Sequence, residues 1–123
     1  MSFAGDITKA IRTLRAINHA ADNALPVATQ SGAEVVRDDA KRRAPRRSGK
    51  LASSIEIKDG SKSPGFSESI VRVGEFYGLF HEFGTSKMAA HPFLRPAGDA
   101  SEAEVGRIIE NSVFSAINRE ATK

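Results

Sequence analysis

Apolar side chains recur at helical spacing through the first third of the chain, and this pattern constrains the fold more than any other feature. Ile7, Ile11 and Leu14 begin an apolar stripe, while basic residues occupy the other faces. The spacing predicts a helix that Asp6 caps at its N-terminus and that runs to about Asn23.

Two prolines mark where this helical pattern changes and where it stops. Pro26 lacks the N–H that an interior helix position donates, so it either kinks one long helix or begins a second one. The apolar stripe continues beyond it. Pro45 disfavours helical geometry at Ala44, and we therefore expect the helical region to end by Arg43.

Alternating apolar and polar residues predict a β-hairpin after the helical region. Ile55 and Ile57 alternate with charged residues, and Val71 and Val73 alternate with polar residues in a second segment. Between the two segments the sequence is rich in serine and glycine and contains a proline, which predicts a long and mobile loop over residues 59–67. The two strands are expected to pair antiparallel.

Two further helices are predicted in the C-terminal half. Phenylalanines recur at i, i+4 and i+7 over residues 76–83, and Gly84 follows, which indicates a short aromatic helix with a glycine at its C-terminal end. The prolines in residues 91–96 predict an extended segment that adds a third strand or an edge. Residues 98–121 are expected to form an amphipathic helix, with acids from Asp99 onward in its first turns.

The predicted order of elements is helix, strand, strand, short helix, extended segment and helix. This is an α+β fold, and the length of 123 residues indicates a single domain spanning residues 1–123. Five of the eight aromatic side chains lie within 18 residues, so this region is expected to be the centre of the core. Truncation of Phe80 or Phe83 to alanine is then expected to cost about 3–5 kcal/mol.

Composition excludes several classes of protein. The chain has no cysteine, which rules out disulfides, thiolate nucleophiles and cysteine-based metal sites. No stretch approaches the length of apolar sequence that a membrane span needs, and the N-terminus mixes acid and base unlike a signal peptide. We therefore expect a protein that is made in the cytoplasm and that has no membrane partner.

His81, Glu82 and His91 are the one group of side chains that suggests catalysis or metal binding. A helical zinc site needs histidines at i and i+4, whereas nine residues separate these two, with glycine and proline among them. A fold-back could still pair the histidines, but surface or interface positions are expected. The chain also lacks a nucleophile elbow and a phosphate-binding glycine loop. We expect no enzyme activity, cofactor, metal or small-molecule substrate.

Six of the eighteen basic residues lie in one stretch of ten that contains no acid. They are Lys41, Arg42, Arg43, Arg46, Arg47 and Lys50. The remainder of the chain has an excess of acids, so the net charge of +3 is a local property. Such a cluster can bind the DNA backbone in a salt-dependent way, but a structural or protein-contact role at the end of the helix is favoured, because the cations also complement the helix dipole.

Three blocks of sequence, in order and in register, resemble the gene-10-like family of tailed-bacteriophage tail-component proteins. The first runs from Ala44-Pro45 through "SGKLASSI" to Ile55, the second is "FYGLFHEFGT", and the third is "MAAHPFLRPA". The resemblance extends over about residues 30–120. Ser48 stands where the family usually has threonine, and His81 stands where an apolar residue is commoner.

The resemblance implies a non-catalytic structural protein of the phage virion, located in the neck or involved in tail completion. It implies a homo-oligomeric ring between the head connector and the tail tube, in contact with other neck, connector and tail-tube proteins. The basic loop at residues 41–50 would then face either DNA in the channel or an acidic neighbouring protein. The alternative is a small DNA-binding accessory protein that uses the same loop.

The second and third blocks are expected to have structural roles in assembly. Gly84 is expected to supply a left-handed turn. Glu82 lies in the last turn of the aromatic helix, where the dipole disfavours an acid, so a cationic partner such as Arg95 or an arginine of the basic loop is expected. The prolines fix the approach to the last helix. The candidate assembly residues are Glu82, Phe83, Gly84, Thr85, Pro92, Phe93, Arg95 and Pro96.

Overall fold

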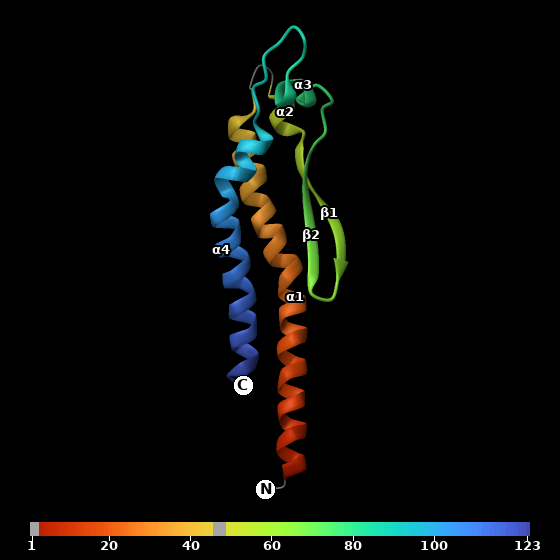
Figure 1. The fold of residues 1–123 in the computed structure, drawn as a ribbon, viewed down its shortest axis with the longest axis vertical. Coiled ribbons are helices and arrows are strands. Elements are labelled where there is room, and N and C mark those ends of the chain that lie inside the picture. The colour runs from red at the N-terminus through yellow and green to blue at the C-terminus, as the bar shows by residue number, and fades with distance from the viewer. Residues whose placement is uncertain (1–2, 46–48) are drawn as a thin grey trace.

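The fold is built along one helix that is much longer than the other elements. A computed structural model describes residues 3–45 and 49–123 (Figure 1). The helix α1 has 41 residues and is roughly 60 Å long at 1.5 Å per residue, about twice the diameter of a small domain. The elements are α1 (Phe3–Arg43), α2 (Lys50–Ser53), β1 (Ile55–Ser63), β2 (Phe66–Val73), α3 (Gly78–Phe83) and α4 (Leu94–Ala121).

The predicted α+β fold is confirmed, and α1 resolves the alternative that Pro26 left open. Pro26 lies inside one continuous helix, and the helix ends at Arg43 as expected from Pro45. The helix begins at Phe3, so the expectation that Asp6 caps it is wrong: Asp6 lies in its first turn. The axis of α1 changes direction in its middle part (Figure 1). No helix in the described residues combines the length and apolar character needed to cross a membrane.

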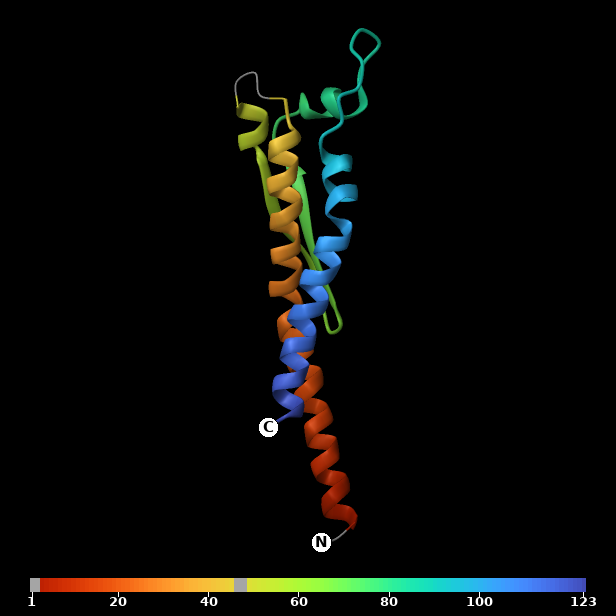
Figure 2. The same ribbon diagram turned by 90° about the vertical axis from the view of Figure 1, so that its left-hand side faces the viewer.

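Helix α1 is the central layer, with α4 packed on one side and the hairpin of β1 and β2 on the other (Figures 1 and 2). Small residues line the contact between the helices. Ala28 and Ala97 are fully buried, and a Cβ added to Gly32 would lie 2.8 Å from Val105 Cγ1. These small side chains let the two helices approach closely, so the contact is long but contains few large apolar groups.

The hairpin places its alternating apolar residues on the face toward the helices. The register pairs Ile55 with Val73 and Ile57 with Val71, as the alternation indicates. The prediction of a long mobile loop over residues 59–67 is wrong, because the strands continue to a two-residue turn at Pro64 and Gly65. The strand register is irregular between Asp59 and Lys62, where a glycine and a serine lie in β1.

Polar contacts hold the tip of this hairpin against α1. The backbone N–H of Gly65 donates to the carboxylate of Asp22 at 2.9 Å. The hydroxyls of Thr29 and Ser67 lie 3.1 Å apart, and Ser69 donates to Thr29 at 3.4 Å. The turn is therefore anchored to the middle of α1 by side chains that the strand pattern alone does not reveal.

The core lies at the end of the molecule where α1 meets α2 and the start of α4. Phe93 and Ile55 are its largest fully buried side chains, at 1% and 2% exposure. Its other buried members are Ala40, Ala44, Leu51 and Ala97. The prediction that the aromatic helix is the packing centre is wrong. Phe76, Phe80 and Phe83 are exposed, and of the five clustered rings only Phe93 is buried.

Two further expectations are corrected at the start of α4. The segment before it does not join the sheet, which has two strands in the described part of the chain. Helix α4 begins at Leu94 and not at residue 98, so Pro96 lies in its first turn and Asp99 lies beyond it. Proline is compatible with a first turn, where the N–H has no partner within the helix.

We predict that Phe93→Ala and Phe83→Ala differ sharply in stability. Phe93→Ala removes a fully buried ring and is expected to lower the free energy of unfolding by about 3–5 kcal/mol. Phe83 is 67% exposed, so Phe83→Ala is expected to change it by less than about 0.5 kcal/mol. Chemical denaturation of both purified variants measures this difference. Equal losses would contradict the assignment of the core.

Candidate interaction site

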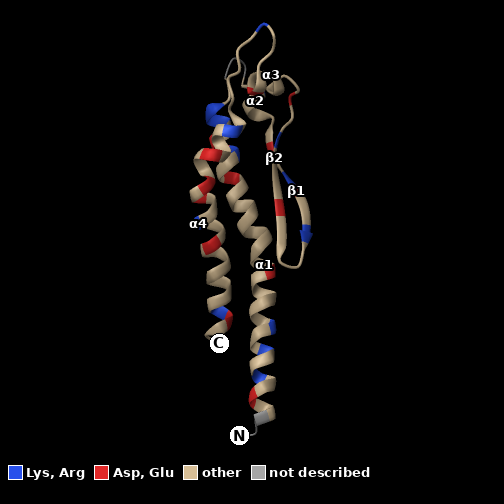
Figure 3. Ribbon diagram, in the orientation of Figure 1, with Lys and Arg blue, Asp and Glu red and all other residues tan. Residues whose placement is uncertain are grey.

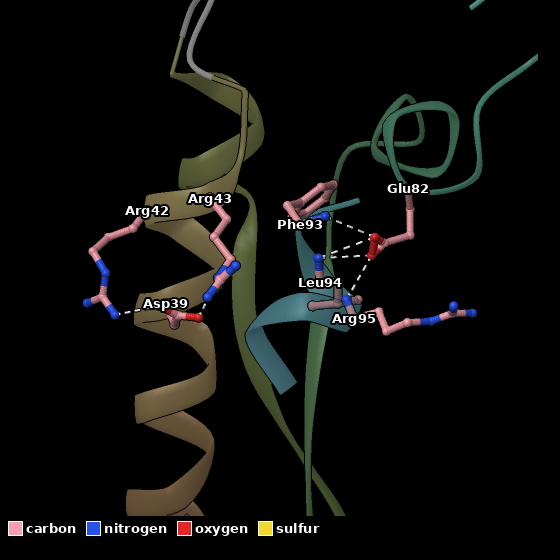
Figure 4. A network of polar contacts seen from close by, with 7 residues as sticks. All are labelled: Asp39, Arg42, Arg43, Glu82, Phe93, Leu94 and Arg95. Carbon is pink, nitrogen blue, oxygen red and sulfur yellow. Dashed lines mark hydrogen bonds and ion pairs between the residues drawn. The ribbon is translucent and has the colours of Figure 1, made fainter. Parts of the chain in front are cut away.

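The carboxylate of Glu82 caps the N-terminus of α4 (Figure 4). It accepts a hydrogen bond from the backbone N–H of Phe93 at 3.0 Å, from that of Leu94 at 2.8 Å and from that of Arg95 at 2.9 Å. The fourth position of this helix start is Pro96, which has no N–H. The first four N–H groups of a helix have no acceptor within the helix. Here the Glu82 carboxylate accepts from three of these positions, and the fourth position is a proline without an N–H.

A tight connection between α3 and α4 brings Glu82 to this position. Gly84 has φ of 76° and ψ of 177°, and a Cβ there would lie 2.8 Å from the backbone N of Ala90, so a glycine is needed here as expected, although its ψ lies outside the left-handed helical region. Thr85 and Met88 form an isolated antiparallel bridge that closes the next turn. The chain then returns to α3, where the N–H of His91 donates to the carbonyl of His81 at 2.7 Å.

The expected cationic partner of Glu82 is replaced by a different interaction. The group that compensates its charge is the positive end of the α4 dipole, together with three N–H donors. Arg95 contributes its backbone and not its guanidinium, which points away from the carboxylate (Figure 4). The prediction that the Arg95 side chain pairs with Glu82 is therefore wrong, whereas the alternative partners Arg46 and Arg47 lie outside the described residues.

His81 and His91 lie next to each other because of the hydrogen bond between their backbone groups. The ring of His81 is partly buried and meets Tyr77 edge to face at 6.5 Å. The side chain of His91 is exposed. In the described residues, no group of three or more His, Cys, Asp or Glu side chains is placed to hold a metal ion.

An apolar groove lies beside the capped helix start, between α3 and α4. We call it the aromatic groove. It encloses about 510 Å³, and Phe76, Leu79 and Phe83 form its outer wall, while Phe93 and Leu94 lie on its α4 side. Sequence reasoning missed this surface by assigning the aromatic helix to the core. The sequence did contain an indication of this surface, because a helix of six residues with apolar side chains on several faces cannot bury all of them.

Part of the basic stretch is neutralised within α1. The carboxylate of Asp39 pairs with Arg42 at 2.6 Å and with Arg43 at 2.7 Å (Figure 4). The hydrogen bond from Arg43 is the main reason why the pKa of Asp39 lies below its usual value, with Arg42 adding to the effect. Lys50 begins α2, and the predictions for Arg46 and Arg47 lie outside the described residues.

Comparison with known proteins identifies a family for this chain. The family model described as "Bacteriophage HK97-gp10, putative tail-component" matches residues 8–84. The chain belongs to this family of bacteriophage tail components. Neither the curated proteins nor the solved structures gave a match.

The family assignment confirms the resemblance inferred from the sequence blocks, over a different span. The match covers α1, the hairpin and α3, and it ends at Gly84. The first block and all but the last residue of the second block lie within it, whereas the proline-rich third block lies beyond it. Membership of a phage tail-component family implies a location in the virion and interactions with other phage structural proteins, and a structural family of this kind favours a non-enzymatic role.

We predict that Glu82 stabilises the fold through the cap. Glu82→Ala leaves three N–H groups without their acceptor and is expected to lower the free energy of unfolding by about 1–3 kcal/mol. Glu82→Gln keeps one acceptor oxygen and loses the charge, so an intermediate loss is expected. Glu102→Gln, at an exposed site on α4, is the control and should lie within about 0.5 kcal/mol of wild type. Equal stability of Glu82→Ala and the control would refute the cap.

We predict that Asp39 stabilises the end of α1 in a pH-dependent way. Because its folded pKa lies below the ordinary value of 3.8, its contribution is present above pH 3.8 and is lost as the pH falls through the folded pKa. The stability difference between wild type and Asp39→Asn should therefore shrink on acidification. Carboxyl NMR titration should show a rise in the pKa of Asp39 in Arg43→Gln. Arg37→Gln, which removes the partner of Asp38, should leave it unchanged.

Proposed function

We propose that this protein is a structural component of the phage neck or of tail completion, where copies of it assemble as a ring between the head connector and the tail tube. Its partners are further copies of the chain and the neighbouring connector and tail-tube proteins. The residues around the capped helix start, including Thr85 and Pro92, hold the contact surface in shape.

The observation that carries this proposal is the amount of apolar surface left uncovered on a family member of this size. Eleven large hydrophobic side chains are exposed in the described residues, and seven of them lie at the two ends of the molecule, three near the start of α1 and four in or just before α3. An isolated small protein rarely exposes contiguous apolar surface of this kind, and large exposed patches mark contact sites. Together with the tail-component family, this favours a protein whose surfaces are covered by neighbours in an assembly.

The DNA-binding alternative receives less support from the geometry. Arg42 and Arg43 share the carboxylate of Asp39, which reduces the local positive charge available to a phosphate backbone. Among the described residues, the exposed aromatic rings lie in or just before α3, in β2 and in α4, all separate in sequence from the basic stretch. Contact between residues 41–50 and channel DNA is compatible with a ring, but DNA binding does not account for the uncovered apolar surfaces.

The proposal is tested on phage particles that lack this protein. Deletion of the gene is expected to give filled heads and separate tails that fail to join, and expression of the wild-type chain in trans should restore joined particles. Image reconstruction of the complemented particles should show its density at the junction between head and tail. Complete, infectious particles in the absence of the protein would refute the proposal. Salt-sensitive DNA binding together with normal particles would favour the accessory-protein alternative.

A further inference from the structure

The N-terminal part of α1 carries an apolar stripe that no other described element covers. We call it the helix stripe. It consists of Ile7, Ile11 and Leu14, which recur at i, i+4 and i+7 and are 44%, 44% and 62% exposed. This part of α1 extends beyond the C-terminal end of α4 in both views (Figures 1 and 2). A helix with an exposed stripe of this spacing has the form that docks into an apolar groove.

The aromatic groove is the matching concave surface, and it lies at the opposite end of the molecule (Figure 1). Phe76, Leu79 and Phe83 stand at i, i+3 and i+7, and they are 78%, 60% and 67% exposed. Because the helix stripe and the groove lie at opposite ends of a long rigid helix, they cannot meet within one chain. They can meet only between two copies.

The segment that carries the helix stripe is basic and the part of α4 that follows the groove is acidic, whereas the groove itself is lined by Glu75, Glu82 and Arg95. Residues 3–15 carry three exposed cations and one acid, whereas residues 99–110 of α4, which follow the groove, carry four exposed acids and one cation. Figure 3 shows the basic residues on the lower part of α1 and the acidic residues on the upper part of α4. An N-terminal helix seated in the groove of a neighbour would bring these oppositely charged segments close together, which favours this pairing over contacts between like surfaces.

We propose that the helix stripe of one copy docks in the aromatic groove of the next copy. The contact is heterologous, because two different surfaces meet, so each copy keeps one unused surface and repetition of the contact generates a ring or an open chain. This inference rests on the proposed assembly function and specifies its contact. The groove is largely formed before docking, since Glu82 fixes the start of α4 beside α3.

Charge substitutions in each surface test the proposal in purified protein. Leu14→Glu and Phe83→Glu each place an acid in an exposed part of the contact, and each is expected to weaken self-association about tenfold or more. Each variant retains one intact surface. A mixture of the two should therefore form heterodimers that do not grow further, measured by analytical ultracentrifugation or native mass spectrometry.

Matched controls carry the same charge change outside the contact. Thr13→Glu lies on another face of the same helix, and Ser86→Glu lies in the exposed turn after α3. Both should self-associate as wild type. Assembly of Leu14→Glu and Phe83→Glu that matches the controls would overturn the proposal, and so would a mixture that forms no heterodimer.

The absence of cysteine allows a second, direct test. Leu14→Cys mixed with Phe83→Cys should form the mixed disulfide in preference to either homodimeric disulfide, because the two positions meet across the contact. Thr13→Cys mixed with Phe83→Cys is the control. A preference for Leu14-to-Leu14 pairing would indicate a symmetric contact, and yields no higher than the control would indicate no contact. Either result overturns the proposal.

The same variants separate this inference from the proposed function. Phage that produce particles normally with Leu14→Glu and with Phe83→Glu would show that the neck role does not use this contact. Failure of the gene deletion to affect particles would refute the neck role itself, whatever the pairing of purified chains. The two results are independent of each other.

Discussion

The capping of α4 by Glu82 is the interaction on which the arrangement of the C-terminal half depends. α4 has 28 residues, yet the segment before it has no regular structure and no place in the sheet. A helix start in such a setting needs acceptors for its N–H groups from another part of the chain. Glu82 supplies them from α3, and Pro96 removes the remaining donor. The same residue therefore fixes where α4 begins and where α3 lies relative to it.

The molecule is elongated because few large apolar side chains lie in the contact between α1 and α4. Alanine and glycine line the contact between α1 and α4, which permits close packing but buries little area for each residue. The large buried groups gather at one end, around Phe93 and Ile55. In the described residues, the far end of α1 consequently packs against no other element, and its isoleucines and leucine remain exposed.

Apart from the short helix α2, which was not predicted, the order and type of the helices and strands were predicted because each depends on local spacing or on a local breaker. The end of α1 at Arg43, the pairing of Ile55 with Val73 and the positive φ of Gly84 all follow from residues that are neighbours in sequence or in a strand pair. Local information is sufficient for such features.

Apart from the start of α1, the features that were predicted wrongly depend on contacts between distant segments. Periodicity shows that the phenylalanines of α3 share a helix, but not whether anything lies opposite them. The continuation of the hairpin through residues 59–67 depends on Asp22, which is more than forty residues from the turn that it holds. The acid that serves the first turn of α4 was sought within α4, whereas it lies in another helix.

The cap and the aromatic groove are connected through their residues. Glu82 and Phe83 are adjacent in α3, and the backbone groups that Glu82 accepts belong to Phe93, Leu94 and Arg95, which also line the groove. The position of one wall relative to the other is thus set by hydrogen bonds that exist before any partner binds. A contact surface that is already ordered loses little conformational entropy on association, so more of the energy of apolar burial remains as affinity. The geometry of a turn and a cap can in this way serve assembly without any of the capping groups touching the neighbour.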